Sequence, residues 1–91
     1  MPLEIHHDPV ARRFTTRVDG VEAEVDYSYD GDYLVINHTG VPRPIEGRGI
    51  ASELTRAVFE FARSAGWKVR PACSYAAAWV RRHTQYSDLV G

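Results

Sequence analysis

Closely spaced glycines stand where an extended segment gives way to a helix, in the run Glu-Gly-Arg-Gly-Ile-Ala-Ser at residues 46–52. The first turn of a helix leaves backbone N–H groups unpaired and carries the positive end of the helix dipole, so glycines there let an anion reach the main chain. The spacing lacks the third glycine of the dinucleotide-binding motif, and no Gly-Lys-Ser/Thr follows as in a P-loop. The run therefore indicates phosphate binding through backbone N–H groups, with an ordinary loop before a helix as the alternative.

A second kind of chemistry is indicated by Cys73, the single cysteine, and by His38. Cys73 directly precedes a predicted helix, whose N-terminus favours a thiolate, and an adjacent imidazole can take the thiol proton. The two residues then form a nucleophile and its base, or His38 acts alone as a general base. The alternative is a buried, inert cysteine and a histidine hydrogen-bonded to the backbone.

Length and composition limit the class of protein. The 91 residues are expected to form a single domain over residues 1–91, and 44% hydrophobic content is ordinary for a globular protein. No apolar run is as long as a membrane span, the N-terminal segment lacks the pattern of a signal peptide, and one cysteine forms no internal disulfide. We therefore expect a cytoplasmic protein. None of the four histidines has metal-ligand spacing, so no metal is expected.

Charge is distributed unevenly along the chain although the net charge is only −1. Residues 1–42 contain three arginines and eight acidic residues, whereas residues 43–91 contain eight basic and four acidic residues. A polyanionic ligand at the glycine run is therefore expected to meet basic side chains, unless these are simply solvated. The near-zero net charge and the lack of a recognised motif argue against a nucleic-acid partner. The basic residues concerned are Arg43, Arg48, Lys68, Arg70, Arg81 and Arg82.

Hydrophobic periodicity predicts an α+β chain with elements in the order β-β-β-α-β-α. Strands are predicted at 12–18, 21–29, 33–38 and 67–71, and helices at 50–65 and 74–83. Asp19-Gly20 supplies a hairpin turn, and Gly66 is suited to end the first helix. Strands 33–38 and 67–71 are expected to be parallel neighbours, because a right-handed crossover helix joins them. Their ends bring His38 and Cys73 to the same edge of the sheet.

This order of elements, together with the loop at 46–51, resembles the fold of the GCN5-related N-acetyltransferases over nearly the whole chain. A minimal form of that fold, with a mixed sheet, is expected. More narrowly, four segments resemble those of the small single-domain YjdJ-type or NATD1-like acetyltransferases. They are His38-Thr39, the loop 42–52, the segment 71–73, and Arg81-Arg82-His83 with the residues after it. The family's glycine-loop pattern falls on Glu46, Gly49 and Ala51, where Glu46 replaces the usual Gln or Arg.

The resemblance implies an N-acetyltransferase that uses acetyl-coenzyme A as co-substrate and an amine as acceptor. The pyrophosphate is expected on the backbone of residues 47–52, and the pantetheine arm between two splayed parallel strands. The acetyl carbonyl is expected at the backbone near residues 38–41, where such folds usually carry a β-bulge. Contacts with the co-substrate are implied for Val41, Glu46, Gly47, Arg48, Gly49, Ile50, Ala51, Ser52, Tyr75, Arg81 and Arg82.

The mechanism and the acceptor stay open. Such enzymes often carry a tyrosine in the last helix that protonates the departing thiolate, but spacing puts Arg81 at that position, with Tyr75 and Tyr86 nearby in the sequence. Transfer is either direct, with His38 as base, or passes through an acetyl-Cys73 intermediate. No helices are inserted between the first two predicted strands, so we expect an open acceptor site, in a monomer or completed in a homodimer. The alternatives are a non-catalytic module that binds acetyl-coenzyme A or coenzyme A, and an RNA- or protein-interaction domain.

Overall fold

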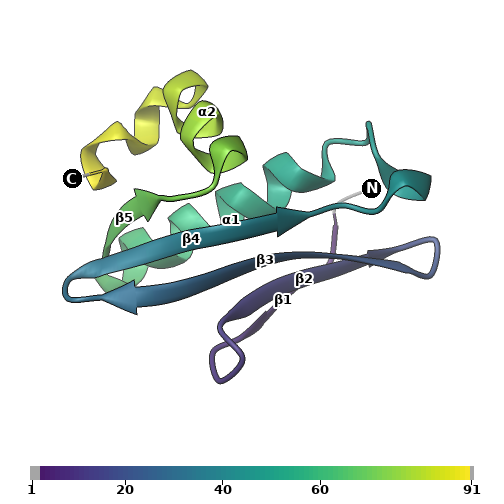
Figure 1. Cartoon of the computed structure of the whole chain (residues 1–91), viewed down its shortest axis with the longest axis horizontal. Coiled ribbons are helices and arrows are strands. Elements are labelled where there is room, and N and C mark those ends of the chain that lie inside the picture. Colours follow the sequence, from purple (N-terminus) through teal and green to yellow (C-terminus); the bar gives the residue numbers. More distant parts are fainter. Residues whose placement is uncertain (1–2, 91) are drawn as a thin grey trace.

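The computed structural model describes residues 3–90 and contains one five-stranded sheet in the order β1-β2-β3-β4-β5 (Figure 1). The strands are β1 (Ile5–Asp8), β2 (Arg13–Val18), β3 (Val21–Asp30), β4 (Tyr33–Gly40) and β5 (Lys68–Pro71). The α-helices are α1 (Ile50–Ala65) and α2 (Ser74–Arg82), and two short 3-10 helices span Arg43–Ile45 and Thr84–Leu89. The first four strands pair antiparallel, and β5 lies parallel to β4. The predicted α+β class with a mixed sheet is confirmed.

The predicted order of elements was wrong at the N-terminal end, because it omitted β1. This strand of four residues contains two histidines and an aspartate, so it lacks the apolar alternation that identifies a strand from sequence. Contacts with β2 stabilise this strand instead. Ile5 and His7 pair with Thr16 and Phe14, and the His7 ring stacks on the Phe14 ring with centroids 4.0 Å apart. The other strands and helices begin and end within two residues of their predicted limits.

Helix α1 covers one face of the sheet, which we call the inner face (Figure 1). Strand side chains alternate between faces, so every second residue turns inward, and α1 meets them with its own apolar stripe. The inward strand residues that are buried are Phe14, Thr16, Ala23, Val25, Tyr27, Leu34, Ile36 and Val69, and those of α1 are Ile50, Leu54, Thr55, Val58, Phe59 and Ala62. On the opposite, outer face no side chain of the described part of the chain is buried.

Helix α2 is fixed to α1 by Trp79. The Trp79 side chain is 1% exposed, its ring lies 5.4 Å from that of Phe59, and its Nε1 donates to Ser52 Oγ at 2.8 Å. Burial of so large an aromatic ring with its N–H group paired gives strong packing at a fixed position. The N-terminal turns of the two helices are therefore held near each other.

A β-bulge interrupts the pairing of β3 with β4 at Asn37. Tyr27 pairs with Ile36 and Asp26 pairs with His38, so Asn37 is the extra residue. Asn37 and His38 are both exposed, and the alternation resumes with Thr39 on the inner face, where His38 would otherwise have pointed. The bulge thus reverses which side chains of β4 face the helices.

Strands β4 and β5 separate where the bulge begins. Their pairing ends at Ile36 and Pro71, and the Ile36 carbonyl then accepts from the N–H groups of Ala72 and Cys73 at 3.0 and 3.1 Å. Strand β4 continues to Gly40, whereas the other segment turns into α2 at Ser74. An opening therefore lies between the end of β4 and the start of α2, on the side where α1 begins.

Candidate functional site

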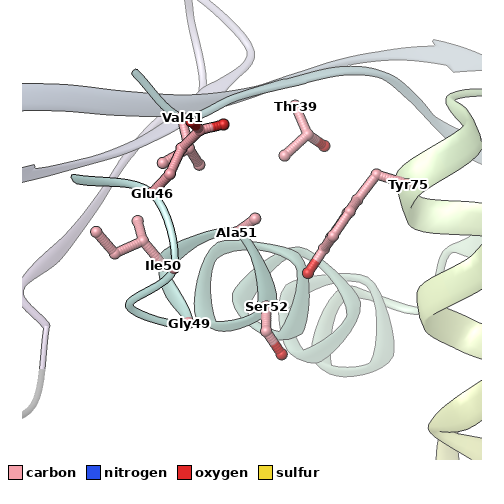
Figure 2. A pocket seen from close by; sticks show the side chains of 9 residues that line it. Thr39, Val41, Glu46, Gly49, Ile50, Ala51, Ser52 and Tyr75 are labelled. Atoms are coloured by element: carbon pink, nitrogen blue, oxygen red, sulfur yellow. The ribbon is translucent and has the colours of Figure 1, made fainter. Parts of the chain in front are cut away.

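A pocket of about 420 Å³ lies at this opening, on the inner side of the sheet (Figure 2). The end of β4, the first turn of α1 and the first turn of α2 surround it. It is lined by Thr39, Val41, Glu46, Gly47, Gly49, Ile50, Ala51, Ser52 and Tyr75. Eight of these nine residues were predicted as contacts of the co-substrate. Thr39 lies within the stretch 38–41 whose backbone was expected at the acetyl carbonyl, but its side chain was not predicted to line the site, because only the bulge turns it toward the helices.

The glycine run forms the part of the pocket wall that suits an anion. Gly47 and Gly49 have φ values of 78° and 76°, the left-handed conformation that favours glycine, and a Cβ at either position would meet nothing within 4 Å. Gly49 precedes α1, no side chain caps the helix there, and the first intrahelical bond runs from Glu53 N–H to the Gly49 carbonyl at 3.1 Å. The N–H groups before Glu53 thus have no intrahelical partner. The open backbone surface fits a pyrophosphate.

Glu46 is an acidic residue in this otherwise anion-binding wall. Figure 2 shows its side chain beside Val41, on the β4 side of the pocket, away from Gly49. The carboxylate is exposed to solvent. Its position leaves the backbone of the helix start uncovered.

Cys73 and Thr39 meet across the opening. Cys73 caps α2, with its Sγ accepting from Ala76 N–H at 3.4 Å, and the same sulfur lies 3.6 Å from Thr39 Oγ1. Cys73 is partly buried. The thiol is therefore held at the start of α2, next to one of the side chains that line the pocket.

Tyr75 reaches from the first turn of α2 toward Ser52 on α1 (Figure 2). Burial raises the pKa of Tyr75, while the nearby Arg82 charge and a hydrogen bond with the Ser52 hydroxyl act in the opposite direction. The hydroxyl is consequently protonated at neutral pH and faces the pocket as a proton donor.

His38 lies on the other face of the sheet from Thr39. Its side chain is 60% exposed, and its Nε2 lies 3.9 Å from Glu24 Oε2. The backbone brings the two predicted catalytic residues to one sheet edge, as expected, because Cys73 N–H bonds to the carbonyl two residues before His38. The bulge nevertheless turns the imidazole outward, and it is Thr39 that contacts the thiol.

The predicted arginine contacts lie outside the pocket lining. Arg48 donates to Asp19 at 2.7 Å, Arg70 donates to Asp30 at 2.9 Å, and Arg81 Nε bonds to the Ala77 carbonyl at 3.3 Å. Lys68 bonds to the Asp88 carbonyl at 3.0 Å. Arg43 and Arg82 are exposed and also absent from the lining. Some of the basic side chains that were expected to meet a ligand therefore bind acidic or carbonyl groups of the protein itself.

Within residues 3–90, no helix is both long enough and apolar enough to cross a membrane. In the same residues no three His, Cys, Asp or Glu side chains group in a way that could hold a metal ion.

The sequence and the fold of this chain are similar to those of known proteins. The family model described as GCN5-related N-acetyl-transferase matches residues 13–89. Protein NATD1 of Gallus gallus is 34% identical over 85 residues, which cover 90% of this chain and 77% of that protein. The human Protein NATD1 is also 34% identical over 85 residues, covering 90% of this chain and 75% of that protein.

A solved structure shows the same architecture. The NMR solution structure of a GCN5-like candidate N-acetyltransferase from Staphylococcus aureus aligns with a TM-score of 0.78 at 30% identity, covering 98% of this chain and 88% of that one. Fold, sequence and the family model agree over most of the chain. The protein therefore belongs to the GCN5-related N-acetyltransferase family, whose activity is acetyl transfer.

Proposed function

We propose that the protein is an acetyl-coenzyme A-dependent N-acetyltransferase of the small YjdJ-type or NATD1-like kind, with a primary amine as acceptor. The observation that carries this proposal is the pocket itself, because the uncapped, glycine-flanked start of α1 adjoins the separation of β4 from β5. The first feature suits a pyrophosphate and the second suits an extended pantetheine arm. The two are continuous within one cavity of about 420 Å³.

Different residues of the pocket bind different parts of the co-substrate. The backbone of residues 47–52 takes the phosphates, Val41 and Ile50 offer apolar contact to the pantetheine arm, and Thr39 stands nearest the thiol of Cys73 at the reacting end. Glu46 faces Val41 and adds no positive charge. Arg48, Arg81 and Arg82 are proposed to reach the phosphates from outside the lining, with Arg48 exchanging Asp19 for the ligand.

Direct transfer uses the groups on both sides of the opening. The amine nitrogen forms a bond to the acetyl carbonyl carbon, and the bond from that carbon to the coenzyme sulfur breaks. One amine proton passes to the unprotonated ring nitrogen of His38, and the departing sulfur takes a proton from the Tyr75 hydroxyl. Tyr75 replaces Arg81 in this role because Tyr75 lines the pocket, whereas the Arg81 guanidinium bonds to its own helix.

A two-step route through Cys73 is the alternative mechanism. The Cys73 thiol gives its proton to solvent and Sγ bonds to the acetyl carbonyl carbon, while the bond from that carbon to the coenzyme sulfur breaks and the coenzyme thiolate takes a proton from the Tyr75 hydroxyl. The amine nitrogen then bonds to the same carbon, the C–Sγ bond breaks, and one amine proton passes to His38. The start of α2 and the Thr39 hydroxyl are the groups that would support the thiolate. A reducing compartment such as the cytoplasm suits a free thiol in this role.

The second candidate function is a non-catalytic module that binds acetyl-coenzyme A or coenzyme A. The observation in its favour is that the His38 and Cys73 side chains point to different faces of the sheet. Such a module uses the same pocket without turnover.

The test combines binding, turnover and mass. Calorimetric titration with acetyl-coenzyme A and with coenzyme A measures binding, release of coenzyme A thiol in the presence of amines measures turnover, and intact mass detects an acetyl adduct. An adduct that disappears in Cys73→Ala supports the two-step route, and turnover that survives Cys73→Ala supports direct transfer. Binding without turnover for any amine supports the passive module, and no binding at millimolar concentration contradicts the proposal. Sedimentation of the same samples distinguishes monomer from homodimer.

A further inference from the structure

Glu24 of β3 lies beside His38 on the outer face of the sheet, directly behind the segment that lines the pocket. We infer that Glu24 is a positioning residue, which orients His38 to take the proton from an acceptor amine that arrives from the outer face. This inference rests on the proposed function, since it assigns the acceptor side of the same site.

The backbone is shaped to bring the two side chains together. Glu24 pairs with Gly40 across β3 and β4, and His38 precedes Gly40 by two residues, so all three face outward. A Cβ at Gly40 would collide with the Glu24 carboxylate and would come within 2.9 Å of His38 Nε2. The absence of a side chain at Gly40 is therefore what leaves room for the carboxylate and the imidazole to approach one another.

The acidic residues on either side of Glu24 pair with arginines, so Glu24 remains to contact His38. The next acid along β3, Asp26, is bound by Arg13 at 2.6 Å, and the preceding one, Glu22, lies 3.9 Å from Arg17. The charge of Glu24 also raises the pKa of Arg13, though less than the charge of Asp26 does. In the described part of the chain, the basic side chain within 4.0 Å of the Glu24 carboxylate is His38, at 3.9 Å, and the two become an ion pair once His38 has taken a proton. Catalytic contacts of this kind are often long before substrate binds.

The opening between the strands connects this pair to the reaction. Thr39 lines the pocket on the inner face, and His38, its neighbour, stands on the outer face where no helix of the described chain packs. With the pantetheine arm on the helix side, the uncovered face is the free approach for an amine. The base is needed whether the acetyl group is on coenzyme A or on Cys73. Because the Glu24 carboxylate lies at His38 Nε2, the neutral imidazole carries its proton there and Nδ1 is the basic nitrogen. The N–C bond forms, the C–S bond breaks, one amine proton goes to His38 Nδ1, and the sulfur leaves as a thiolate or takes a proton.

Turnover of three primary amines, Nα-acetyl-lysine, spermidine and phenethylamine, tests the inference in the full chain with saturating acetyl-coenzyme A. We expect Glu24→Gln to lower kcat by about tenfold and His38→Ala by about a hundredfold or more, while affinity for acetyl-coenzyme A is unchanged. The double variant should be no slower than His38→Ala alone, because Glu24 acts only through the imidazole. Glu24→Asp should recover part of the rate. Gly40→Ala displaces two flexible side-chain ends and should lower kcat like Glu24→Gln.

Glu22→Gln is the matched control. It neutralises the neighbouring acid on the same face of β3, which also has a partner 3.9 Å away, and should leave kcat unchanged. Turnover by the wild type with an unchanged kcat in Glu24→Gln overturns this inference and leaves the proposed function standing. Additive losses in the double variant, or an equal loss in Glu22→Gln, overturn it as well. No turnover of any amine by the wild type overturns the inference together with the catalytic function.

Discussion

Gly49 is the single residue on which the phosphate site depends most. Its left-handed backbone turns the chain into α1, and its missing side chain leaves the first N–H groups of the helix open to the pocket. The glycine spacing predicted this from sequence. The place of Thr39 was not predictable, because the extra residue at Asn37 has no distinctive sequence signal and yet changes the face to which every later side chain of β4 points.

Gly49→Ala should weaken binding of acetyl-coenzyme A by about tenfold or more and should also cost about 1 kcal/mol of stability, because Ala is strained at φ 76°. Gly66→Ala is the matched control, since Gly66 has φ 82° at the other end of α1 and does not line the pocket. Calorimetric titration and urea unfolding of both variants separate strain from ligand contact. Equal affinities in the two variants would contradict the role given to Gly49.

Tyr75→Phe should lower kcat while leaving affinity for acetyl-coenzyme A unchanged, because only the proton donor is lost. Burial raises the pKa of Tyr75 above its ordinary value near 10, so the donor form persists through mildly alkaline pH. The wild-type rate should therefore show no loss due to this group up to about pH 9, one unit below the ordinary value. A pH–rate profile measures this, and a Tyr75→Phe enzyme as fast as the wild type would rule out the hydroxyl as the acid.

At the scale of elements, regular strands and helices were predictable from their patterns, whereas a β-bulge near residues 38–41 was expected only from the family resemblance and lies at Asn37. Alternation marks β2 and β3, and helical spacing with Gly66 marks α1 to the residue. Strand β1 depends on pairing with β2, and the bulge depends on pairing of β3 with β4; neither is encoded in a local pattern. The pocket lies where the bulge in β4 adjoins the first turns of α1 and α2. Its location was therefore predictable from the sequence, whereas the residues that line it were predictable only in part.

The docking of α2 onto α1 should control the shape of the pocket, because Ser52 both binds Trp79 and lines the cavity. Trp79→Phe keeps an aromatic ring but removes the donor to Ser52, and should cost about 1 kcal/mol in unfolding free energy. Trp79→Ala should cost about 3–5 kcal/mol. Urea unfolding measures both changes. A loss in Trp79→Ala below that of Trp79→Phe would contradict the assignment of Trp79 as the anchor.

At the scale of the whole molecule, the uneven charge of the sequence is partly cancelled by folding. Arg48 with Asp19 and Arg70 with Asp30 join the basic part of the chain to the acidic part. The number of charges follows from the sequence but their partners in space do not, so two arginines that were expected to meet a polyanionic ligand instead bind aspartates of the same chain. Exposed pairs of this kind contribute little stability and can exchange partners.

Folding also raises the pKa of several tyrosines. Burial raises the pKa of Tyr27, Tyr75 and Tyr86, with a hydrogen bond to Glu60 adding to the effect at Tyr86. The folded state therefore holds these protons more tightly than the unfolded chain, whose tyrosines titrate near pH 10. Stability from this source is complete below that pH and declines above it. The free energy of unfolding in urea should be lower at about pH 10.5 than at about pH 8; an equal or higher value at the alkaline pH would contradict this.

The central claim is that acetyl-coenzyme A binds at the glycine-flanked start of α1, in the opening between β4 and β5. Titration of isotope-labelled protein with acetyl-coenzyme A, followed by amide NMR, tests it most directly. We predict saturable binding, with the largest amide shifts at Gly47, Gly49 and the residues up to Ser52, and further shifts at Thr39 and Tyr75. No binding at millimolar concentration, or shifts confined to the outer face of the sheet, would contradict the claim.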